Sequence, residues 1–492
     1  MPHPPANSDE SPDSSARLTA AQQAAVAELL RVSPIIDELG ELFAGNGFQL
    51  HLVGGSVRDA LLGRLGDDLD FTTDARPEQI QQIVRPWGEA MWDTGIEFGT
   101  VGVSKHGYLI EVTTFRTDSY DGASRHPVVS FGEALIDDLQ RRDFALNAMA
   151  VSVPGHEFAD PFGGLSDLAA GRLDTPSTPE RSFTDDPLRM LRAVRFAAQL
   201  DVTPVPRVRA AIEAMAPQIA RITAERVQAE LSKLMLAANP RAGLTLLVDT
   251  GLADQVLPEL PALRLERDEH HQHKDVYQHS LTVLEQAMAQ EQDAPDLTLR
   301  LAALLHDIGK PATRRFADGG GVSFHHHEVV GAKLVRKRLR ALKFPKQLIE
   351  DVADLTFLHL RFHGFAGGEW TDSAVRRYAT DAGELLPRLH KLVRADCTTR
   401  NARRRASLQA AYSALERRIA TIAAAEDLAK IRPDLDGNAI MELLGIPAGP
   451  VVGRAWKFLK ELRLDRGPLD REVAEAELLG WARREGVLDP PG

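Results

Sequence analysis

The 492-residue sequence contains a single cysteine, Cys397. One thiol cannot form an intramolecular disulfide bond, and it cannot build a zinc site that needs several cysteines. This scarcity favours a protein of a reducing compartment, and the length predicts two to four domains.

Long apolar runs are also missing. No stretch of about 18 uncharged apolar residues could span a bilayer. The first 15 residues are rich in proline, serine and aspartate and lack the apolar segment of a signal peptide, so we expect a disordered tail there. We predict a cytoplasmic protein that makes no use of a membrane.

Positive charge is in short supply overall. The net charge of −12 weighs against nucleic acid as a partner, because phosphate binding needs positive potential. Two local runs depart from this average: residues 333–346 hold seven Lys/Arg and no acid, and residues 399–405 hold four arginines. A solvated helix face explains either run as well as an RNA contact does.

Local patterns divide the chain into an α+β part and a helical part. Residues 16–47 predict helix, and "FQLHLVGG" and "VGVSKHGYLIEVTTF" predict strands of one sheet. After about residue 173, long amphipathic patterns predict mostly helix, and histidines cluster beyond about residue 261. We therefore expect segments at 1–15, 16–172, 173–260, 261–400 and 401–492.

The stretch "HLVGGSVRDALLG" predicts a strand, a turn at Gly54-Gly55 and a helix carrying Arg58. Glycines let a phosphate approach the backbone, and a helix N-terminus offers N–H donors. Downstream, Asp68 and Asp70 would point to the same side of a strand. A D-x-D taken alone is more often a solvated turn, but the glycine turn before it favours Mg²⁺ with substrate phosphates.

Two further groups of residues carry chemistry. Glu111 lies in a predicted strand and could complete a carboxylate site or could pair with Arg116. His306 and Asp307 end an apolar helix, where both could ligate a metal ion if others converge. The run beginning at His327 is not a zinc-protease motif, because Gly331 stands where HExxH needs its second histidine.

Five motifs occur together in order: "LVGGSVRDALLG", "DDLDFTTDA", "EVTTFRTDSYDGASRHP", "RRDFALNAMA" and "DDPLRMLRAVRF". They resemble the class II tRNA nucleotidyltransferases and bacterial poly(A) polymerases over residues 48–200, and "AERVQAELSKLM" extends the resemblance to residue 235. The resemblance implies a polymerase-β-like palm (16–172), a helical neck (173–260), an HD domain (261–400) and a helical, tRNA-binding C-terminal region (401–492).

The resemblance also implies roles for single residues of the palm. Asp68 and Asp70 would hold Mg²⁺, and Gly55, Arg58 and Arg142 would contact the incoming nucleotide. Residues 119–127 would form a mobile loop near the site.

A recognition helix over residues 184–196 would carry the base-reading residues. Asp186 and Arg189 stand at the family's base-reading positions, and Arg192 and Arg195 at positions that hold the nucleotide. Asp185 departs from the glutamate more often found there.

An Asp/Arg pair one helical turn apart has a physical reason to select bases. Cytosine and adenine both offer an amino donor next to a ring-nitrogen acceptor, so Asp186 can accept from the first while Arg189 donates to the second. Uracil and guanine present a carbonyl oxygen and a ring N–H there, which repel or fail to pair with the same two side chains. A surface salt bridge is the alternative interpretation of the pair.

The histidine-rich segment resembles the HD-family phosphohydrolases. His279, His306, Asp307 and Asp396 match the H…HD…D ligand set, and His327 and His359 match additional ligands of one subset. The resemblance implies an unidentified divalent metal there. An HD-like domain that contacts RNA and has an empty metal site is the alternative.

Template-independent addition of C, C and A to the 3′ end of tRNA from CTP and ATP is the predicted function. A poly(A) polymerase shares the palm motifs, but its family members tend to carry basic C-terminal extensions that this acidic chain lacks. An HD-type phosphohydrolase as the main activity is a further alternative. A non-catalytic RNA-binding protein is disfavoured, because Asp68 and Asp70 are both present.

Overall fold

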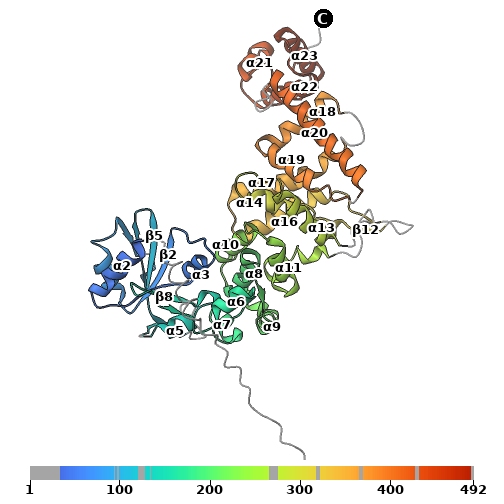
Figure 1. Ribbon diagram of the computed structural model, residues 1–492. Helices are drawn as coiled ribbons and strands as arrows, with labels where there is room; N and C mark the ends of the chain where they lie inside the picture. Colours follow the sequence, from blue (N-terminus) through green and yellow to red (C-terminus); the bar gives the residue numbers. More distant parts are fainter. Residues whose placement is uncertain are drawn as a thin grey trace, which may run out of the picture. The chain divides into compact units, whose positions relative to one another are not determined.

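The computed structural model describes residues 34–93, 95–96, 99–119, 128–132, 134–264, 275–316, 322–364, 370–399, 401–426 and 432–488. The chain divides into two compact units, residues 1–256 and 257–492 (Figure 1). None of the helices in the described ranges is both long and apolar enough to cross a membrane.

A seven-stranded mixed sheet forms the centre of the N-terminal part of unit 1 (Figure 1). Its strand order is β3-β4-β5-β2-β1-β8-β9, and β2 and β5 are parallel while the other neighbours run antiparallel. The strands are β1 (Leu50–Val53), β2 (Asp68–Thr73), β3 (Ala90–Trp92), β4 (Thr100–Lys105), β5 (Tyr108–Thr114), β8 (Ala150–Val153) and β9 (Phe158–Ala159). The predicted single sheet is confirmed.

Apolar side chains of these strands pack against three helices, α2 (Pro34–Gly45), α3 (Gly55–Leu61) and α4 (Pro77–Val84). Leu39 and Phe43 of α2, Val57 of α3 and Ile80 of α4 are fully buried against the sheet. Of the helix predicted over 16–47, residues 16–33 lie outside the described residues. On the other face of the sheet, apolar residues of β1, β8 and β9 pack with Leu139 of α5 (Leu135–Gln140), which leaves β2 and β5 to carry polar groups there.

The rest of unit 1 is mostly helical, as predicted. Helix α8 packs against both α10 and α11. The elements are α5 (Leu135–Gln140), η2 (Ala145–Asn147), α6 (Gly164–Ala169), α7 (Pro179–Asp185), α8 (Leu188–Leu200), α9 (Pro206–Met215), η3 (Ala216–Arg221), α10 (Ala224–Met235), α11 (Pro240–Asp249) and α12 (Leu252–Val256). Three two-stranded ladders complete the strands: β6 (Arg116–Ser119) with β7 (Val128–Phe131), β10 (Arg172–Leu173) with β11 (Thr203–Pro204), and in unit 2 β12 (Arg315–Phe316) with β13 (Val322–Ser323).

The single helix expected over residues 184–196 is wrong. Helix α7 ends at Asp185 and α8 begins at Leu188, and Asp186 between them has an extended backbone (φ −142°, ψ 101°). The cause is Pro187, which lacks an N–H and disfavours the helical conformation in the residue before it. Asp186 therefore stands at a break between two helices, not one turn before Arg189 on the same helix.

Unit 2 is built almost entirely from helices (Figure 1). Helices α13, α14, α16, α17 and α19 pack together, and α21, α22 and α23 share a separate small core. The elements are η4 (Pro261–Leu263), α13 (Val276–Met288), α14 (Leu297–Leu305), α15 (Lys310–Thr313), α16 (His327–Ala341), α17 (Lys346–Leu358), η5 (His359–Gly364), α18 (Asp372–Ala382), η6 (Gly383–Leu385), α19 (Leu386–Ala395), α20 (Ala402–Ala425), α21 (Gly437–Leu444), α22 (Pro450–Arg466) and α23 (Arg471–Arg484).

Candidate active site and metal centre

Strand β2 presents its two aspartates on one side of the sheet. Asp68 and Asp70 are exposed, whereas Leu69 and Phe71 are buried. Alternation along the strand produces this pattern, and the predicted common orientation of the two carboxylates is confirmed. Neighbouring protein atoms raise the pKa of Asp70 by partial desolvation, the negative charge of Asp68 raises it further, and the charges of Arg142 and Arg58 oppose the rise.

Glu111 adds a third carboxylate from the adjacent strand. The parallel register of β2 and β5 places Glu111 opposite Asp70. Desolvation, followed by the charges of Asp70 and Asp68, raises the pKa of Glu111. Three carboxylates with mutual repulsion therefore share one face of the sheet, and oxygen ligands of this kind suit a hard divalent cation.

The glycine turn is connected to β2 by hydrogen bonds of Ser56, the residue that follows the two glycines. Gly54 has φ 69°, a conformation that favours glycine, and a Cβ there would lie 2.8 Å from Nη1 of Arg142. Ser56 Oγ accepts a hydrogen bond from Asp70 N (2.9 Å) and donates to Asp68 O (3.4 Å). The turn thus sets the position of both aspartates and lets Arg142 approach the backbone.

Arginines surround the carboxylates, and each has a partner that holds it. Arg58 donates to Asn147 Oδ1 (2.6 Å) and forms an ion pair with Asp59 (2.8 Å). Arg142 pairs with the fully buried Asp138 (3.1 Å). These contacts order long side chains before any ligand arrives, which lowers the entropy lost on binding a polyphosphate.

Helix α8 contributes two more arginines around one aromatic ring. Arg192 pairs with Asp143 (2.6 Å) and Arg195 with Glu230 (2.8 Å). The guanidinium carbons of Arg58, Arg192 and Arg195 lie 5.4, 5.5 and 4.4 Å from the centre of the Phe196 ring. Three cations on one ring form a cluster that favours a polyanion.

Asp186 and Arg189 do not pair with each other. Asp186 Oδ1 accepts from Leu188 N (3.0 Å), and Oδ2 accepts from Arg226 (2.7 Å). Arg189 donates to Ser182 Oγ (2.9 Å) and to Arg141 O (2.6 Å). Arg226 is not among the residues that the sequence predicts for the site, because nothing local in a helix 40 residues away indicates this partner.

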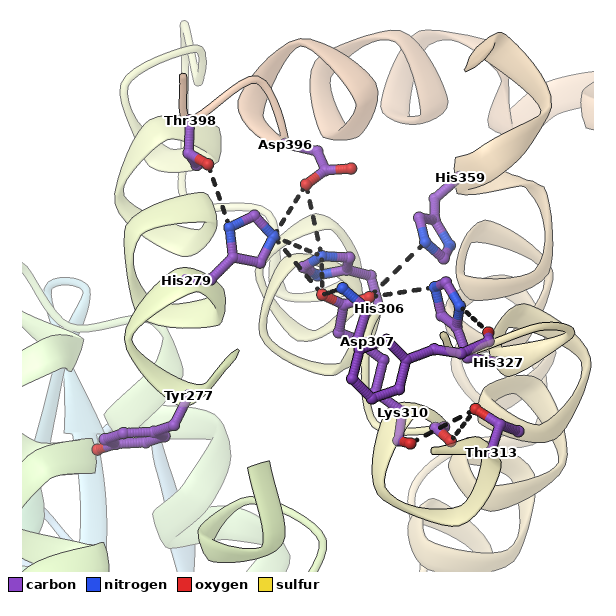
Figure 2. Close-up of polar contacts among 12 residues, drawn as sticks. Tyr277, His279, His306, Asp307, Lys310, Thr313, His327, His359, Asp396 and Thr398 are labelled. Atoms are coloured by element: carbon purple, nitrogen blue, oxygen red, sulfur yellow. Dashed lines mark hydrogen bonds and ion pairs between the residues drawn. The ribbon is translucent and has the colours of Figure 1, made fainter. Parts of the chain in front are cut away.

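The second cluster lies in unit 2 and joins six residues from several helices (Figure 2). His279 is on α13, His306 and Asp307 follow α14, His327 begins α16, His359 begins η5 and Asp396 follows α19. All six are positions that the resemblance predicts as ligands, and the structure brings them together.

All four histidines of the cluster are held at Nδ1, so that Nε2 faces the centre (Figure 2). In three of them Nδ1 lies against a backbone carbonyl three residues earlier: His306 at 2.9 Å, His327 at 2.9 Å and His359 at 2.6 Å. His279 Nδ1 lies 3.2 Å from Thr398 Oγ1. A carbonyl can only accept, so in these three Nδ1 donates, and Nε2 is the atom that offers a lone pair when the ring is neutral, the arrangement found in metal-bound histidines.

Asp307 belongs to one of two groups of potential ligands and also contacts the other. Its Oδ2 is 3.2 Å from His306 Nε2, and its Oδ1 is 3.2 Å from His327 Nε2. One group comprises His279, His306 and Asp396 and the other Asp307, His327 and His359, with ligand atoms in each within 4.8 Å of one another. Among the described residues no other group of three meets this spacing, so the palm carboxylates are less closely assembled.

The electrostatics of the cluster match a bound cation. His279 Nε2 and His306 Nε2 are 3.3 Å apart, so in the absence of a metal one of the two nitrogens must carry a proton that the other accepts. Burial opposes protonation of His306, but Asp307 and Asp396 raise its pKa to about 9, whereas burial and the charge of His306 lower the pKa of His359 to about 3. The residues therefore fit divalent metal ions.

Cationic groups also lie near this centre. Lys310 Nζ is 2.9 Å from Asp307 Oδ2. Burial raises the pKa of the Cys397 thiol, and the charges of Arg405 and Arg404, at the start of α20, partly oppose the rise. The sequence analysis does not single out Lys310 or Thr398, although Lys310 lies three residues after Asp307 and Thr398 two residues after Asp396, spacings that could have indicated both.

One face of α16 carries basic residues without acidic partners. Lys333, Lys337 and Arg340 of α16, with Lys343 just after it, are exposed and line a shallow hollow, and none of them forms an ion pair among the residues that the structure describes. On the same segment, Arg336 and Arg338 do pair, with Glu350 and Glu259 respectively. The predicted basic run is thus only partly neutralised. Arg400 of the second run lies outside the described residues, as do residues 120–127 of the predicted mobile loop.

Three protein families match the chain. The Poly A polymerase head domain matches residues 50–174, the probable RNA- and SrmB-binding site of polymerase A matches residues 201–263, and the HD domain matches residues 276–401.

Relatives and solved structures agree with these matches. A CCA-adding enzyme of Levilactobacillus brevis is 43% identical over 42% of this chain, and the match spans about half (51%) of that relative. An A-adding tRNA nucleotidyltransferase of Deinococcus radiodurans is 34% identical over 88% of this chain and 95% of its own length. The crystal structure of the Bacillus stearothermophilus CCA-adding enzyme in complex with CTP is 26% identical and superimposes with a TM-score of 0.65 over 92% of this chain and 99% of that one.

Proposed function

Because this chain belongs to the tRNA nucleotidyltransferase family, we propose that it adds C, C and A to the 3′ end of tRNA from CTP and ATP and releases pyrophosphate. The observation that carries the proposal is the open face of the palm sheet, where Asp68, Asp70 and Glu111 adjoin a cluster of ordered arginines. The similarity to a CCA-adding enzyme in complex with CTP supports the choice of nucleotide.

Asp68 and Asp70 would hold Mg²⁺, with Glu111 as a further oxygen donor. A divalent ion there would stabilise the charge that develops at the α-phosphate and would lower the pKa of the attacking 3′ hydroxyl of the tRNA. The chain's own part is geometric: Ser56 fixes the backbone of β2, and Arg142 limits the repulsion among the carboxylates.

The triphosphate would lie against the arginine cluster. Gly55 lets it approach the backbone beside Arg58, while Arg142, Arg192 and Arg195 balance its charge. Asp143 and Glu230 keep Arg192 and Arg195 in place before the nucleotide arrives. Asp186 and Arg189 would select the base. Asp186 would accept a hydrogen bond from the amino group of C or A, and Arg189 would donate one to the ring nitrogen.

A second assignment, addition of A alone, is favoured by one observation. The relative that matches nearly along its whole length is an A-adding enzyme. The assay that decides uses three tRNA substrates, ending before the first C, after one C and after both. Incorporation of labelled CTP into the first two, and of ATP only into the third, supports CCA addition. Incorporation of ATP into the third with no use of CTP supports A addition, and long A tails on any RNA support the poly(A) alternative.

We divide the chain as 16–172 palm, 173–260 neck, 261–400 HD domain and 401–492 C-terminal tRNA-binding region, with 1–15 as a tail. The tRNA would contact the exposed basic face of α16 through its phosphates. The reaction needs no membrane, and a cytoplasmic location fits a tRNA substrate.

A second activity is proposed for the six-residue centre of unit 2, metal-dependent hydrolysis of phosphate esters. His279, His306, Asp307 and Asp396, together with His327 and His359, would hold the ions, and Lys310 would steady Asp307. Hydrolysis of p-nitrophenyl phosphate and bis(p-nitrophenyl) phosphate by metal-free enzyme resupplied with Mg²⁺, Mn²⁺, Ni²⁺ or Zn²⁺ tests it. No hydrolysis with any ion would instead support a centre kept for structure.

A further inference from the structure

Helix α10 approaches the break between α7 and α8 with two charged side chains. Arg226 and Glu230 are four residues apart and so share one face of α10. Arg226 forms an ion pair with Asp186 (2.7 Å), and Glu230 forms one with Arg195 (2.8 Å). Both partners are residues proposed to hold the nucleotide. One helix thus contacts the base-reading and the nucleotide-holding parts of the site together.

The carboxylate of Asp186 has two fixed contacts. Leu188 N donates to Oδ1, and Arg226 donates to Oδ2. Its backbone is extended and lies outside both helices, so the local helix does not fix its side-chain rotamer. Without Arg226, the Leu188 contact alone would hold the carboxylate, and rotation about that contact would turn the free oxygen away.

The Arg226 contact contributes little to folding. The Arg226 side chain is 50% exposed and that of Asp186 24% exposed, and ion pairs with this exposure add little stability. By contrast, the Arg195–Glu230 pair is almost completely buried. A long, exposed arginine that orders a partly exposed carboxylate is better explained by what that carboxylate must bind.

We propose that Arg226 is a positioning residue for nucleotide selection, which holds the Asp186 carboxylate in the orientation that accepts the amino group of C or A. This inference rests on the proposed role of Asp186. Each carboxylate oxygen has two acceptor positions, so Asp186 can keep Arg226 and still accept from a base. A fixed carboxylate also keeps its repulsion against the carbonyl oxygen of U or G, whereas a rotating one avoids it.

The test is the value of kcat/KM for CTP and UTP, measured on tRNA that ends before the first C. Arg226→Ala is expected to lower the value for CTP about 10-fold and to raise that for UTP, since the rotating carboxylate no longer repels its carbonyl oxygen, so that the preference for CTP falls by more than about 10-fold. Arg226→Lys, which retains a donor, should restore most of the preference. Arg221→Ala is the matched control, because Arg221 is also exposed and contacts α7 only at the carbonyl of Thr184.

A double-mutant cycle separates this inference from the role of Asp186. If Arg226 acts through Asp186, adding Arg226→Ala to Asp186→Ala causes no further loss of preference. Equal losses for CTP and UTP in Arg226→Ala, or a gain for CTP, would overturn the positioning role. An unchanged preference in Asp186→Ala alone would overturn the base-reading proposal itself, whereas a loss in Asp186→Ala with none in Arg226→Ala overturns only this inference.

Discussion

The two candidate metal sites differ in how far they are assembled before a ligand arrives. In unit 2, His306 and Asp307 are 1% and 2% exposed, and every histidine is oriented by a second contact at Nδ1. In the palm, Asp68 and Asp70 stand on an exposed strand face and repel each other and Glu111. A buried, pre-oriented centre suits ions that stay with the protein, whereas an open carboxylate face suits ions that arrive with nucleotide and primer.

The largest expected effect concerns the open carboxylate face. Asp68→Ala and Asp70→Ala should each reduce nucleotide addition by roughly 10³-fold or more, because charge stabilisation by a metal contributes several kcal/mol to the transition state. Binding of tRNA should stay nearly unchanged, since the carboxylates would serve the chemistry and not the RNA. Single-turnover incorporation and a tRNA binding titration measure the two quantities.

Asp67→Ala is the control for this pair, because Asp67 precedes β2 and its backbone carbonyl, not its side chain, bonds to Leu109. Turnover retained in either Asp68→Ala or Asp70→Ala would remove that residue from the site.

The next effect concerns the buried centre and tests whether the two sites are independent. His306→Ala and Asp307→Ala should abolish metal-dependent hydrolysis of phosphate esters and lower the bound metal per chain, because each takes a ligand from a group of three. Nucleotide addition should be largely unchanged. Elemental analysis after dialysis gives the metal content directly. If folded His306→Ala protein no longer adds nucleotides, the separation into two sites is wrong.

Selectivity at the base gives a smaller effect. The Asp186→Ala enzyme should lose its preference for CTP and ATP over UTP and GTP, because the carboxylate that repels the carbonyl oxygens of U and G is gone. Arg189→Ala should instead weaken C and A, whose ring nitrogen loses its donor. Each loss is expected at about 1–3 kcal/mol, or roughly 10- to 150-fold in kcat/KM. Small and equal losses for all four triphosphates would indicate that the two side chains serve only the local structure.

The palm also contains a buried ion pair whose contribution depends on pH. Burial would raise the pKa of Asp143, but the charge of Arg192 and hydrogen bonds from Asn147 and Arg192 lower it to about 2. Since the folded pKa lies below the unfolded value of about 3.9, the stabilisation is present above about pH 4 and is lost as the pH falls towards about 2. Asp143→Asn should cost about 2 kcal/mol at about pH 6 and progressively less below about pH 4. Urea unfolding at about pH 6 and about pH 3 compares the two proteins, and a constant difference contradicts the assignment.

How much the sequence predicts depends on whether the information is local. Alternation is enough to place Asp68 and Asp70 on a common side, and Pro187 is enough to predict the helix break that the helical spacing of the arginines obscures. Two features depend on distant packing: the register that sets Glu111 beside Asp70, and the contact of Arg226 with Asp186. No periodicity of either segment contains that information.

The histidine cluster illustrates the same limit within one site. Its six ligands are predicted by resemblance, yet the orientation of each ring is not. That orientation depends on carbonyls at helix ends, such as Ala303 O and Thr356 O, which are available because the last carbonyls of a helix lack intrahelical partners. Such positions become visible only when the ends of the helices are known.

The smallest expected effect concerns two lysines of α16, which differ from the arginines of the palm in having no acidic partner among the described residues. In the palm, Arg58, Arg142 and Arg192 each have a carboxylate partner, whereas Lys333 and Lys337 on α16 have none among the described residues. A paired arginine is oriented for one ligand, but unpaired lysines on a helix face suit a phosphate backbone, whose binding needs charge more than direction. Replacing both by alanine should weaken tRNA binding roughly 3- to 10-fold and lower the slope of log Kd against log salt by about 0.7–0.9 for each phosphate that the variant no longer neutralises. Replacing both by arginine preserves the charge and should preserve the slope. An unchanged slope in the alanine variant would return this face of α16 to ordinary solvated surface.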